Sequence, residues 1–176
     1  LLPIAEALEA AHQLGIVHRD VTPANVFLSQ QGSLVVPKLI DFGLAERIDR
    51  PARRDEQLYG TPQFMAPELV LGKPADARAD IWSFGAVLYR CLSGRSPAEG
   101  IPIDELVDLD ADLASTIYRA LHPEPDHRFG SMTDVVRALD AHREALVSAP
   151  PPATSPTVTT LSTMPVRRAA VRPHPT

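Results

Sequence analysis

A short hairpin with polar residues at both ends is the feature that most constrains how this chain can fold. Two apolar runs, residues 26–28 and 34–40, flank a polar turn that contains Gly32, and this pattern predicts a pair of antiparallel strands. Asn25 precedes the first run and Asp41 follows the second. Because a hairpin brings the outer ends of its strands together, we expect the side chains of Asn25 and Asp41 at one edge of this sheet.

Another carboxylate, Asp20, lies shortly before Asn25, and Pro23 between them restricts the loop backbone. Carboxylate and amide oxygens are the protein ligands that hard cations such as Mg²⁺ prefer, and phosphate oxygens can supply the others. Asp20, Asn25 and Asp41 together therefore indicate a site for a divalent cation and a phosphate group. Either aspartate, taken alone, would also be explained as an ordinary turn residue.

The composition is that of a globular protein and argues against several other classes. The chain has 176 residues, 44% of them hydrophobic, and a formal net charge of -5, so one domain is expected and nothing indicates a nucleic-acid partner. Cys91 is the single cysteine, which excludes a disulfide framework and fits a reducing, cytoplasmic compartment. No apolar run approaches the roughly 18 residues of a membrane-spanning helix, and no secretory signal is visible. The first residue is Leu1, so the chain is expected to be part of a longer protein, which leaves room for a membrane tether beyond its C-terminal end.

Helices are predicted where apolar residues recur at helical spacing, at residues 1–15, 80–92, 113–121 and 131–145. Gly94 is suited to end the second of these, and Ser131 or Thr133 to cap the last. The second helix is apolar on most faces, so we expect it to be buried, with Cys91 as a small core residue. Residues 44–68 contain few apolar residues and predict a long irregular loop.

The chain is expected to divide into a domain at residues 1–147 and a tail at residues 148–176. From residue 149 onward the sequence holds seven prolines, several threonines, no acidic residue and three arginines. Such a segment cannot bury enough apolar surface to offset the entropy cost of ordering, so we expect disorder. A linker explains this composition better than a basic docking or membrane-proximal segment.

Five motifs, in order along residues 1–145, resemble those of protein kinases. His18-Arg19-Asp20 with Asn25 is similar to the kinase catalytic loop, and Asp41-Phe42-Gly43 is similar to the motif that holds the metal. The other three resemble the end of the activation segment, the start of the central helix of the large lobe and a late arginine motif, at residues 66–68, 80–85 and 125–128. Each motif alone is weak evidence, and their common order carries the resemblance.

The resemblance implies catalytic and binding roles for particular residues. Asp20 looks like the residue that accepts or orients the proton of the substrate hydroxyl, and Asn25 and Asp41 look like the ligands of Mg²⁺. Phe27 matches a position that packs beneath the adenine ring of ATP, and the plain alternative, a core residue of the strand, is compatible with that role. Thr61 matches the threonine that serine/threonine-specific kinases place against the catalytic aspartate, which favours serine or threonine as the acceptor.

Other matched residues would hold the site in shape. Asp80 resembles a buried carboxylate that accepts backbone N–H bonds from the catalytic loop. Glu68 and Arg128 resemble a buried ion pair that ties the activation segment to the late helices. Arg19 matches the arginine that receives an activation-loop phosphate. The remaining structural members of these motifs are His18, Phe42 and Gly43.

One residue and one segment depart from the family pattern. Thr22 stands where serine/threonine kinases usually have a lysine that contacts the transferring phosphate; its hydroxyl can still donate a hydrogen bond, but a positive charge is lost. Residues 44–59 contain no serine or threonine, so Arg19 lacks the usual phosphorylated partner there. Asp55 or Glu56 could replace that phosphate permanently, or both could be solvated loop charges.

The sequence therefore predicts an α+β, mainly α-helical fold similar to the C-terminal lobe of a protein kinase, with a small β-hairpin carrying the catalytic loop. The chain has no glycine-rich loop and no strand lysine, so we expect the N-terminal lobe to be absent and the isolated chain to be inactive. The resemblance implies that the parent protein is a bacterial-type kinase, which uses ATP and Mg²⁺ to phosphorylate serine or threonine in a protein substrate. The alternative is a non-catalytic, pseudokinase-like regulatory or scaffold module.

Overall fold

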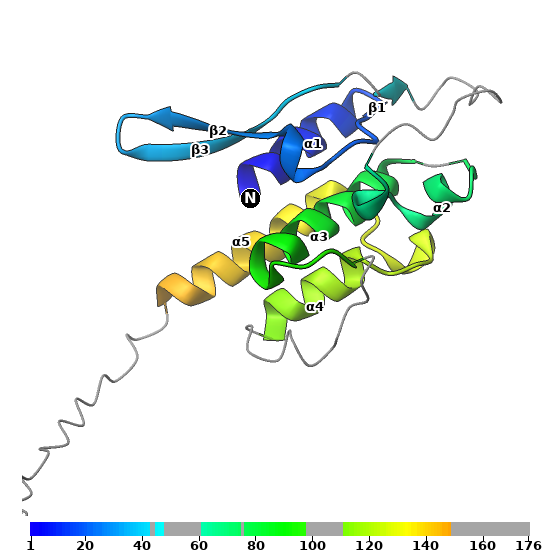
Figure 1. Cartoon of the computed structure of the whole chain (residues 1–176). Coiled ribbons are helices and arrows are strands. Elements are labelled where there is room, and N and C mark those ends of the chain that lie inside the picture. The colour runs from blue at the N-terminus through cyan, green and yellow to red at the C-terminus, as the bar shows by residue number, and fades with distance from the viewer. Residues whose placement is uncertain (43–44, 48–60, 75, 98–110, 149–176) are drawn as a thin grey trace, which may run out of the picture.

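The computed structural model describes residues 1–42, 45–47, 61–74, 76–97 and 111–148. In this part of the chain, helices pack beneath a layer formed by a hairpin and the first helix (Figure 1). Several sequence predictions lie outside the described residues: Gly43, the acidic residues Asp55 and Glu56, and the tail from residue 149.

Helix α1 (Leu2–Gln13) forms where the sequence predicts it. Its buried side chains recur every three or four residues and so share one face, the signature of an amphipathic helix. After the helix, Gly15 has φ 71°, a left-handed conformation that glycine adopts without strain. The buried residues of the apolar face are Ile4, Ala5, Leu8 and Ala11.

The predicted hairpin is present as β2 (Val26–Gln31) and β3 (Leu34–Leu39), which pair antiparallel. The register runs from Val26 opposite Leu39 to Gln31 opposite Leu34. The turn is therefore reduced to two residues, because the ladder continues through polar residues that the apolar pattern did not include. One of these two is Gly32 with φ 63°, a conformation that a tight hairpin turn requires.

A second antiparallel pair joins β1 (Ile16–Val17) to β4 (Glu46–Arg47). The loop after β1 leads through the 3₁₀ turn η1 (Pro23–Asn25) directly into β2. The predicted irregular loop at residues 44–68 is thus partly wrong. Its described residues include β4, the 3₁₀ turn η2 (Pro62–Phe64) and the start of α2 (Pro67–Val70).

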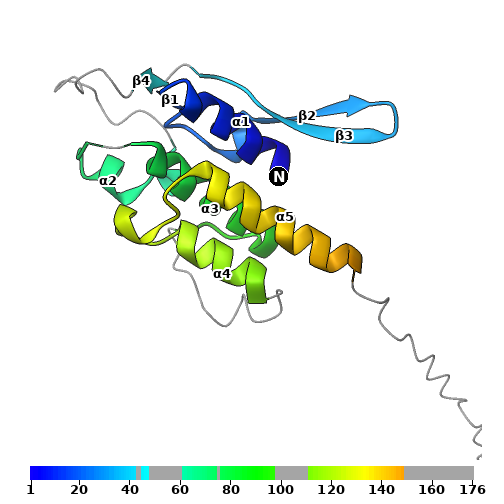
Figure 2. The same ribbon diagram turned by 180° about the vertical axis from the view of Figure 1, so that it is seen from behind.

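Helix α3 (Ala77–Ser93) is the central element and lies among α1, α4 and α5 (Figure 2). It begins three residues before the predicted start, because Asp76 caps it by accepting a hydrogen bond from the Arg78 backbone N–H at 2.8 Å. Gly94 ends it with φ 74°, as predicted. Most residues from Ala79 to Tyr89 are buried on several faces, so this helix forms the middle of the core.

The remaining helices close the lower layer. Helix α4 (Ala111–Ala120) packs against α3, and α5 (Met132–Ser148) packs against α1 and α4. Ser131 caps α5, because its hydroxyl oxygen accepts from the Asp134 backbone N–H at 3.3 Å. Between α4 and α5 lies the 3₁₀ turn η5 (Pro125–His127).

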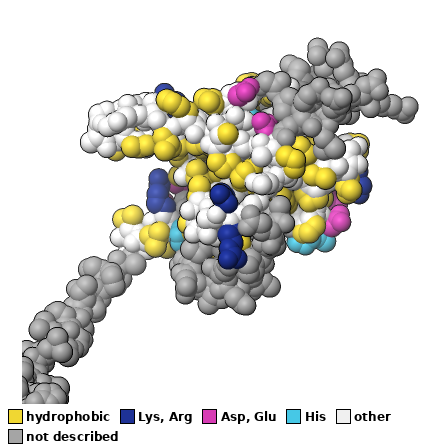
Figure 3. Space-filling model, in the orientation of Figure 1, with side chains coloured by type: hydrophobic (Ala, Val, Ile, Leu, Met, Phe, Trp, Pro, Cys, Tyr) yellow, Lys and Arg dark blue, Asp and Glu magenta, His cyan; other side chains and the backbone are white. Residues whose placement is uncertain are grey.

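The expected burial of Cys91 is wrong, because the structure places this residue on the surface. Burial along α3 stops at Tyr89, and Leu92 in the following turn is also exposed. The last turn of the helix therefore extends past the core. Hydrophobic side chains are also visible along the hairpin (Figure 3), where Leu28, Leu34 and Val35 are exposed. No helix in the described part of the chain is both long and apolar enough to cross a bilayer.

Candidate functional site

Asp80 anchors the loop that carries the candidate catalytic residues. Its carboxylate is fully buried, and its two oxygens accept hydrogen bonds from consecutive backbone N–H groups of the loop. Arg19 N–H donates to Oδ1 and His18 N–H donates to Oδ2, each at 2.8 Å. These are the backbone bonds that the sequence led us to expect. A buried carboxylate is tolerated only when such donors satisfy it, so the loop and α3 depend on each other.

Two non-glycine residues near this anchor have left-handed backbone conformations. Arg19 has φ 67° and Asp41 has φ 62°. Such conformations cost an L-residue about 1–3 kcal/mol and persist only where surrounding contacts hold them. Both residues belong to the predicted functional motifs, so within the described part of the chain this strain lies in segments that would have to present side chains in one fixed direction.

Asn25 links the hairpin to Asp20. Its side-chain amide donates to the backbone oxygen of Asp20 at 2.8 Å and to the carboxylate oxygen Oδ2 of Asp20 at 2.9 Å. The amide nitrogen of Asn25 thus contacts both the backbone and the side chain of Asp20. The loop of Asp20 and the start of β2 are thus held as one unit.

The segment containing Asp41 returns to the same place. The backbone oxygen of Asn25 accepts from the Ile40 N–H at 2.9 Å, so Asp41 follows a residue that is bonded to Asn25. Phe42 packs on the ring of His18, with the ring centroids 4.5 Å apart. These two contacts, on either side of Asp41, bring the candidate metal-binding segment against the catalytic loop. The Asp41 side chain is exposed at this edge.

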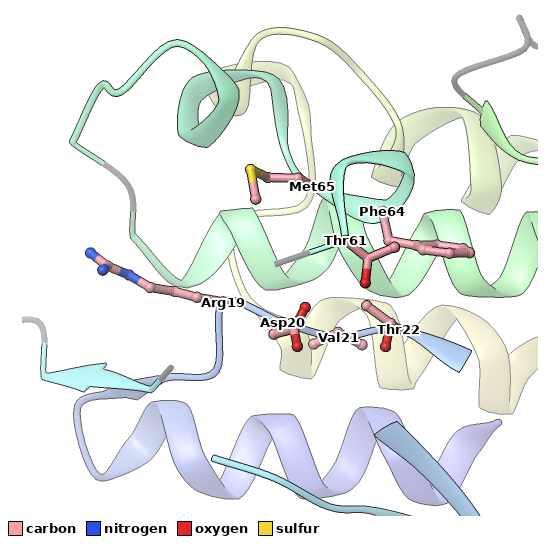
Figure 4. A pocket seen from close by; sticks show the side chains of 7 residues that line it. All are labelled: Arg19, Asp20, Val21, Thr22, Thr61, Phe64 and Met65. Atoms are coloured by element: carbon pink, nitrogen blue, oxygen red, sulfur yellow. The ribbon is translucent and has the colours of Figure 1, made fainter. Parts of the chain in front are cut away.

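Asp20 opens toward a pocket that also contains both candidate threonines. The pocket is lined by residues 19–22 together with Thr61, Phe64 and Met65 (Figure 4). The side chains of Asp20, Thr22 and Thr61 lie around a common space, whereas Arg19 extends away from it (Figure 4). Thr22 is buried. The pocket therefore brings together one carboxylate and two hydroxyl groups, which Asp20, Thr22 and Thr61 supply from two separate segments of the chain.

Glu68 and Arg128 form a buried ion pair between α2 and the end of η5. The guanidinium contacts both carboxylate oxygens at 2.7 Å. Its remaining N–H groups donate to the backbone oxygens of His122, Arg78 and Pro123. All five donors of Arg128 are satisfied, which is the condition for keeping such a charge buried.

Phe27 lies on the surface, with 57% of its area exposed. The alternative that it is a core residue of the strand is therefore wrong. It is next to the segment that contains Asn25, on the same hairpin. An exposed aromatic ring at this place offers an apolar surface to a ligand or to another part of the protein.

Sequence reasoning missed two groups of side chains near this framework. The ring nitrogen Nε2 of His12 lies 2.8 Å from Oδ2 of Asp80. Arg78 pairs with Asp76 and Asp126 at 2.8 Å and 2.6 Å. Burial tends to raise the pKa of Asp76, but hydrogen bonds from Arg78 and its positive charge outweigh this and hold the pKa below its usual value. Hydrogen bonds to Asp76 and Asp126 raise the pKa of Arg78.

Comparison with protein families decides what this framework is. The model of the protein kinase domain matches residues 1–157. This chain belongs to the protein kinase family. The kinase domain is related to bacterial serine/threonine protein kinases. The strands, turns and helices described above belong to this domain.

Individual relatives are bacterial proteins. The serine/threonine-protein kinase PkaA of Streptomyces coelicolor is 38% identical over 156 residues, which cover 81% of this chain and 28% of PkaA. The serine/threonine-protein kinase Pkn1 of Myxococcus xanthus is 36% identical over 158 residues, 79% of this chain and 23% of Pkn1. The probable serine/threonine-protein kinase PknB of Corynebacterium glutamicum is 43% identical over 103 residues, 57% of this chain and 16% of PknB. The chain thus spans between 16% and 28% of the length of these relatives.

Protein kinases generally use ATP and Mg²⁺, and the donor set here suits that cation. The amide nitrogen of Asn25 donates to Asp20, so the Asn25 side-chain oxygen would be the atom that binds a hard cation, and Asp41 follows the residue whose N–H is bonded to Asn25. Among the described residues, no three His, Cys, Asp or Glu side chains are grouped so that they could hold a metal by themselves. A cation bound by Asn25 and Asp41 would therefore take its other ligands from phosphate and water, as Mg²⁺ commonly does.

Proposed function

We propose that this chain forms the catalytic-loop half of a bacterial-type serine/threonine protein kinase, which transfers the γ-phosphoryl group of ATP to a serine or threonine hydroxyl. The observation that carries the proposal is the position of Asn25. It donates two hydrogen bonds to Asp20 and accepts one from the residue before Asp41. A single side chain and its backbone thus connect the candidate base with the candidate metal ligand.

Asp20 is the residue that would orient the acceptor hydroxyl. Its Oδ2 is occupied by Asn25, so Oδ1 would accept the proton of the hydroxyl as the new bond from oxygen to the γ-phosphorus forms and the bond to the β-phosphate oxygen breaks. Thr61 and Thr22 line the same pocket and supply hydroxyl groups that can hold Asp20 and a phosphate oxygen in place. ADP would leave with the electrons of the broken bond.

Asn25 and Asp41 would hold Mg²⁺, which neutralises the charge that develops on the phosphates. The left-handed backbone at Asp41 and the packing of Phe42 on His18 would fix the direction in which the Asp41 carboxylate points. Phe27 would pack against the adenine ring, for which its exposed side chain provides the surface. The other contacts to ATP would come from segments of a longer protein that carries this chain.

A second candidate function rests on Thr22. The position carries no positive charge, and its side chain is buried, so the site lacks one cation that would stabilise charge in the transition state. This observation favours a non-catalytic, pseudokinase-like module that binds a nucleotide or a protein without transferring phosphate. The presence of Asp20, Asn25 and Asp41 on adjoining segments that hydrogen bonds join favours the enzyme over this alternative.

Phosphate transfer in the longest natural protein that carries this chain separates the two candidates. Transfer from γ-labelled ATP to a library of serine and threonine peptides is measured for the natural protein and for Asp41→Asn. A matched control is Glu144→Gln, which makes the same change from carboxylate to amide at an exposed position of α5. The proposal expects Mg²⁺-dependent transfer that Asp41→Asn abolishes and Glu144→Gln preserves. Absence of transfer in the natural protein, with Mg²⁺·ATP still bound, would favour the non-catalytic module.

A further inference from the structure

The turn after α3 contacts the wall of the pocket that lies opposite the catalytic loop. The pocket lies between the loop of residues 19–22 and the segment of residues 61–65 (Figure 4). Ser96, in the turn that follows α3, donates its hydroxyl hydrogen to the backbone oxygen of Gln63 at 3.4 Å. Gln63 lies in η2, and the next residue, Phe64, lines the pocket. The bonded residues are 33 positions apart, so the contact joins two separate parts of the chain.

The backbone oxygen of Gln63 has a partner outside η2, unlike the two backbone oxygens before it. The oxygens of Thr61 and Pro62 accept hydrogen bonds from N–H groups of the same segment, at 2.9 Å and 3.3 Å. Backbone oxygens close to the protein interior need such partners, because an unpaired one costs free energy. The bond from Ser96 therefore satisfies the next oxygen of the turn and joins η2 to the end of α3.

Ser96 is held in place by the turn that carries it. The residue is 1% exposed, and a buried hydroxyl costs free energy unless it is hydrogen-bonded. Before it, Gly94 has the left-handed φ of 74° that ends α3, and the Arg95 N–H donates to the Ser93 hydroxyl oxygen at 3.1 Å. These contacts fix the backbone between the end of α3 and Ser96.

The segment of η2 belongs to the acceptor side of the proposed site. Asp20 opens toward this pocket, whereas the candidate cation ligands Asn25 and Asp41 are not among the residues that line it. Phe64 and Met65 supply apolar surface to its wall. In the proposed function, a peptide whose hydroxyl approaches Asp20 would therefore contact this segment, and ATP would not.

We infer that Ser96 is a positioning residue for the acceptor side of the pocket, acting through the backbone of η2. Its hydroxyl holds η2 at a fixed place relative to α3. The same helix carries Asp80, which accepts the backbone N–H groups of the loop before Asp20. Both sides of the pocket are thus held against one helix. The inference rests on the proposed function for its catalytic consequence, whereas its structural part concerns η2 alone.

Two substitutions separate the hydroxyl group from the presence of a side chain at this position. Ser96→Ala removes the hydroxyl, and Ser96→Thr keeps it. Ser115→Ala is the matched control, because it makes the same change at an exposed position of α4. Amide hydrogen exchange is followed by NMR in the 176-residue chain, with the buried residues Phe84 and Val87 of α3 as references.

The inference expects exchange at the amides of Phe64 and Met65 to rise about threefold to fivefold in Ser96→Ala relative to the references. Both amides are hydrogen-bonded within the η2 segment, and a long bond between neutral groups contributes at the lower end of the usual range. Ser96→Thr should keep most of the protection, and Ser115→Ala should change none of it. No rise at these amides, or an equal rise at the references or in Ser96→Thr, would overturn the inference.

Kinetics of the longest natural protein that carries this chain test the catalytic consequence separately. Ser96→Ala should raise KM for the acceptor peptide by about threefold to fivefold and leave KM for ATP unchanged, and Ser96→Thr should restore the natural value. An unchanged KM for the peptide, or a change confined to KM for ATP, would contradict the inference and leave the proposed function intact. If the natural protein transfers no phosphate while the exchange result holds, the proposed function fails and the contact between Ser96 and η2 stands.

Discussion

Arg128 and Glu68, 60 residues apart in sequence, form a bidentate contact in which Nη1 and Nη2 of Arg128 each lie 2.7 Å from a different carboxylate oxygen. The Arg128 side chain is fully buried and the Glu68 side chain is 8% exposed. The pair joins α2, which follows the pocket residues Phe64 and Met65, to the turn before α5. The segment that carries Phe64 and Met65 is therefore followed by a helix that a buried charge pair ties to the turn before α5.

Breaking this pair from one side should be strongly destabilising. Glu68→Gln removes the negative charge but keeps the shape, so the Arg128 guanidinium stays buried without a counter-charge. We expect a loss of about 3–5 kcal/mol in the free energy of unfolding, measured by urea denaturation followed by circular dichroism. Arg143→Met, which removes an exposed partner of Asp140 on α5, should cost less than about 1 kcal/mol. Similar losses in both variants would contradict the account of the buried pair.

Gly85 allows α3 and α4 to approach each other closely. A methyl group at this position would lie 2.8 Å from Cβ of Ala120, so the helices would have to move apart. Gly85→Ala should therefore lower the free energy of unfolding by about 1–3 kcal/mol, and the additional change Ala120→Gly should recover part of it.

Gly94→Ala provides the comparison for this variant. Among the described residues, nothing lies within 4 Å of a methyl group at Gly94, so within this part of the chain its φ of 74° is the source of strain. The cost of about 1 kcal/mol expected there should not change when Ala120→Gly is added. If Ala120→Gly also restored stability to the Gly94→Ala variant, its effect could not be attributed to relief of the contact between residues 85 and 120.

The sequence predicted the elements better than their ends and their tertiary partners. Periodic apolar residues located the helices and the hairpin, because burial of one face is a local pattern. The start of α3 was missed, since its cap Asp76 precedes a polar first turn that carries no apolar signal. Strands as short as β1 and β4 have too few residues for any alternation to be recognised.

The candidate site was predictable only where it lies within contiguous motifs. Asp20 and Asn25 are close in sequence, so their proximity follows from a short loop. The bond between His12 and Asp80 joins two helices, and nothing in either local sequence indicates it. The exposure of Cys91 likewise depends on where the core ends along α3, which is set by the helices packed against it.

Because of Asp76, the stability of the folded protein should depend on pH in the acidic range. Its pKa lies below the ordinary value of 3.8 in the folded protein, because the effect of Arg78 outweighs that of burial. Its contribution is therefore complete well above pH 3.8 and decreases as the pH falls through 3.8 toward the folded-state pKa. The carboxylate is 47% exposed, so the contribution is small, about 1 kcal/mol or less.

Melting temperatures of the natural chain and of Asp76→Asn at several pH values test this expectation. The natural chain should be the more stable at pH 6, and the difference should shrink between about pH 4 and pH 3. A difference that is constant over this range would show that Asp76 acts as a neutral helix cap.

Asn25→Ala should disconnect Asp20 from the hairpin. The variant loses both amide donors to Asp20 and one candidate ligand of Mg²⁺, and we expect kcat of the natural protein to fall by about 10²-fold or more. Stability should change little, because the backbone bond from Ile40 to Asn25 is retained. Steady-state kinetics and thermal unfolding measure the two effects, and Gln30→Ala, at an exposed position of the same strand, is the control. Unchanged kcat in Asn25→Ala would contradict the assignment of this residue.

The position of the cation itself tests the central claim most directly. Mn²⁺, used with ATP in place of Mg²⁺, broadens the NMR signals of nearby nuclei in the natural protein. The account predicts that the side-chain amide of Asn25 and the backbone amides of Asp41 and Phe42 broaden together, and that Asp41→Asn removes the effect. Broadening centred elsewhere in the chain, or at only one of the two segments, would contradict a cation held between Asn25 and Asp41.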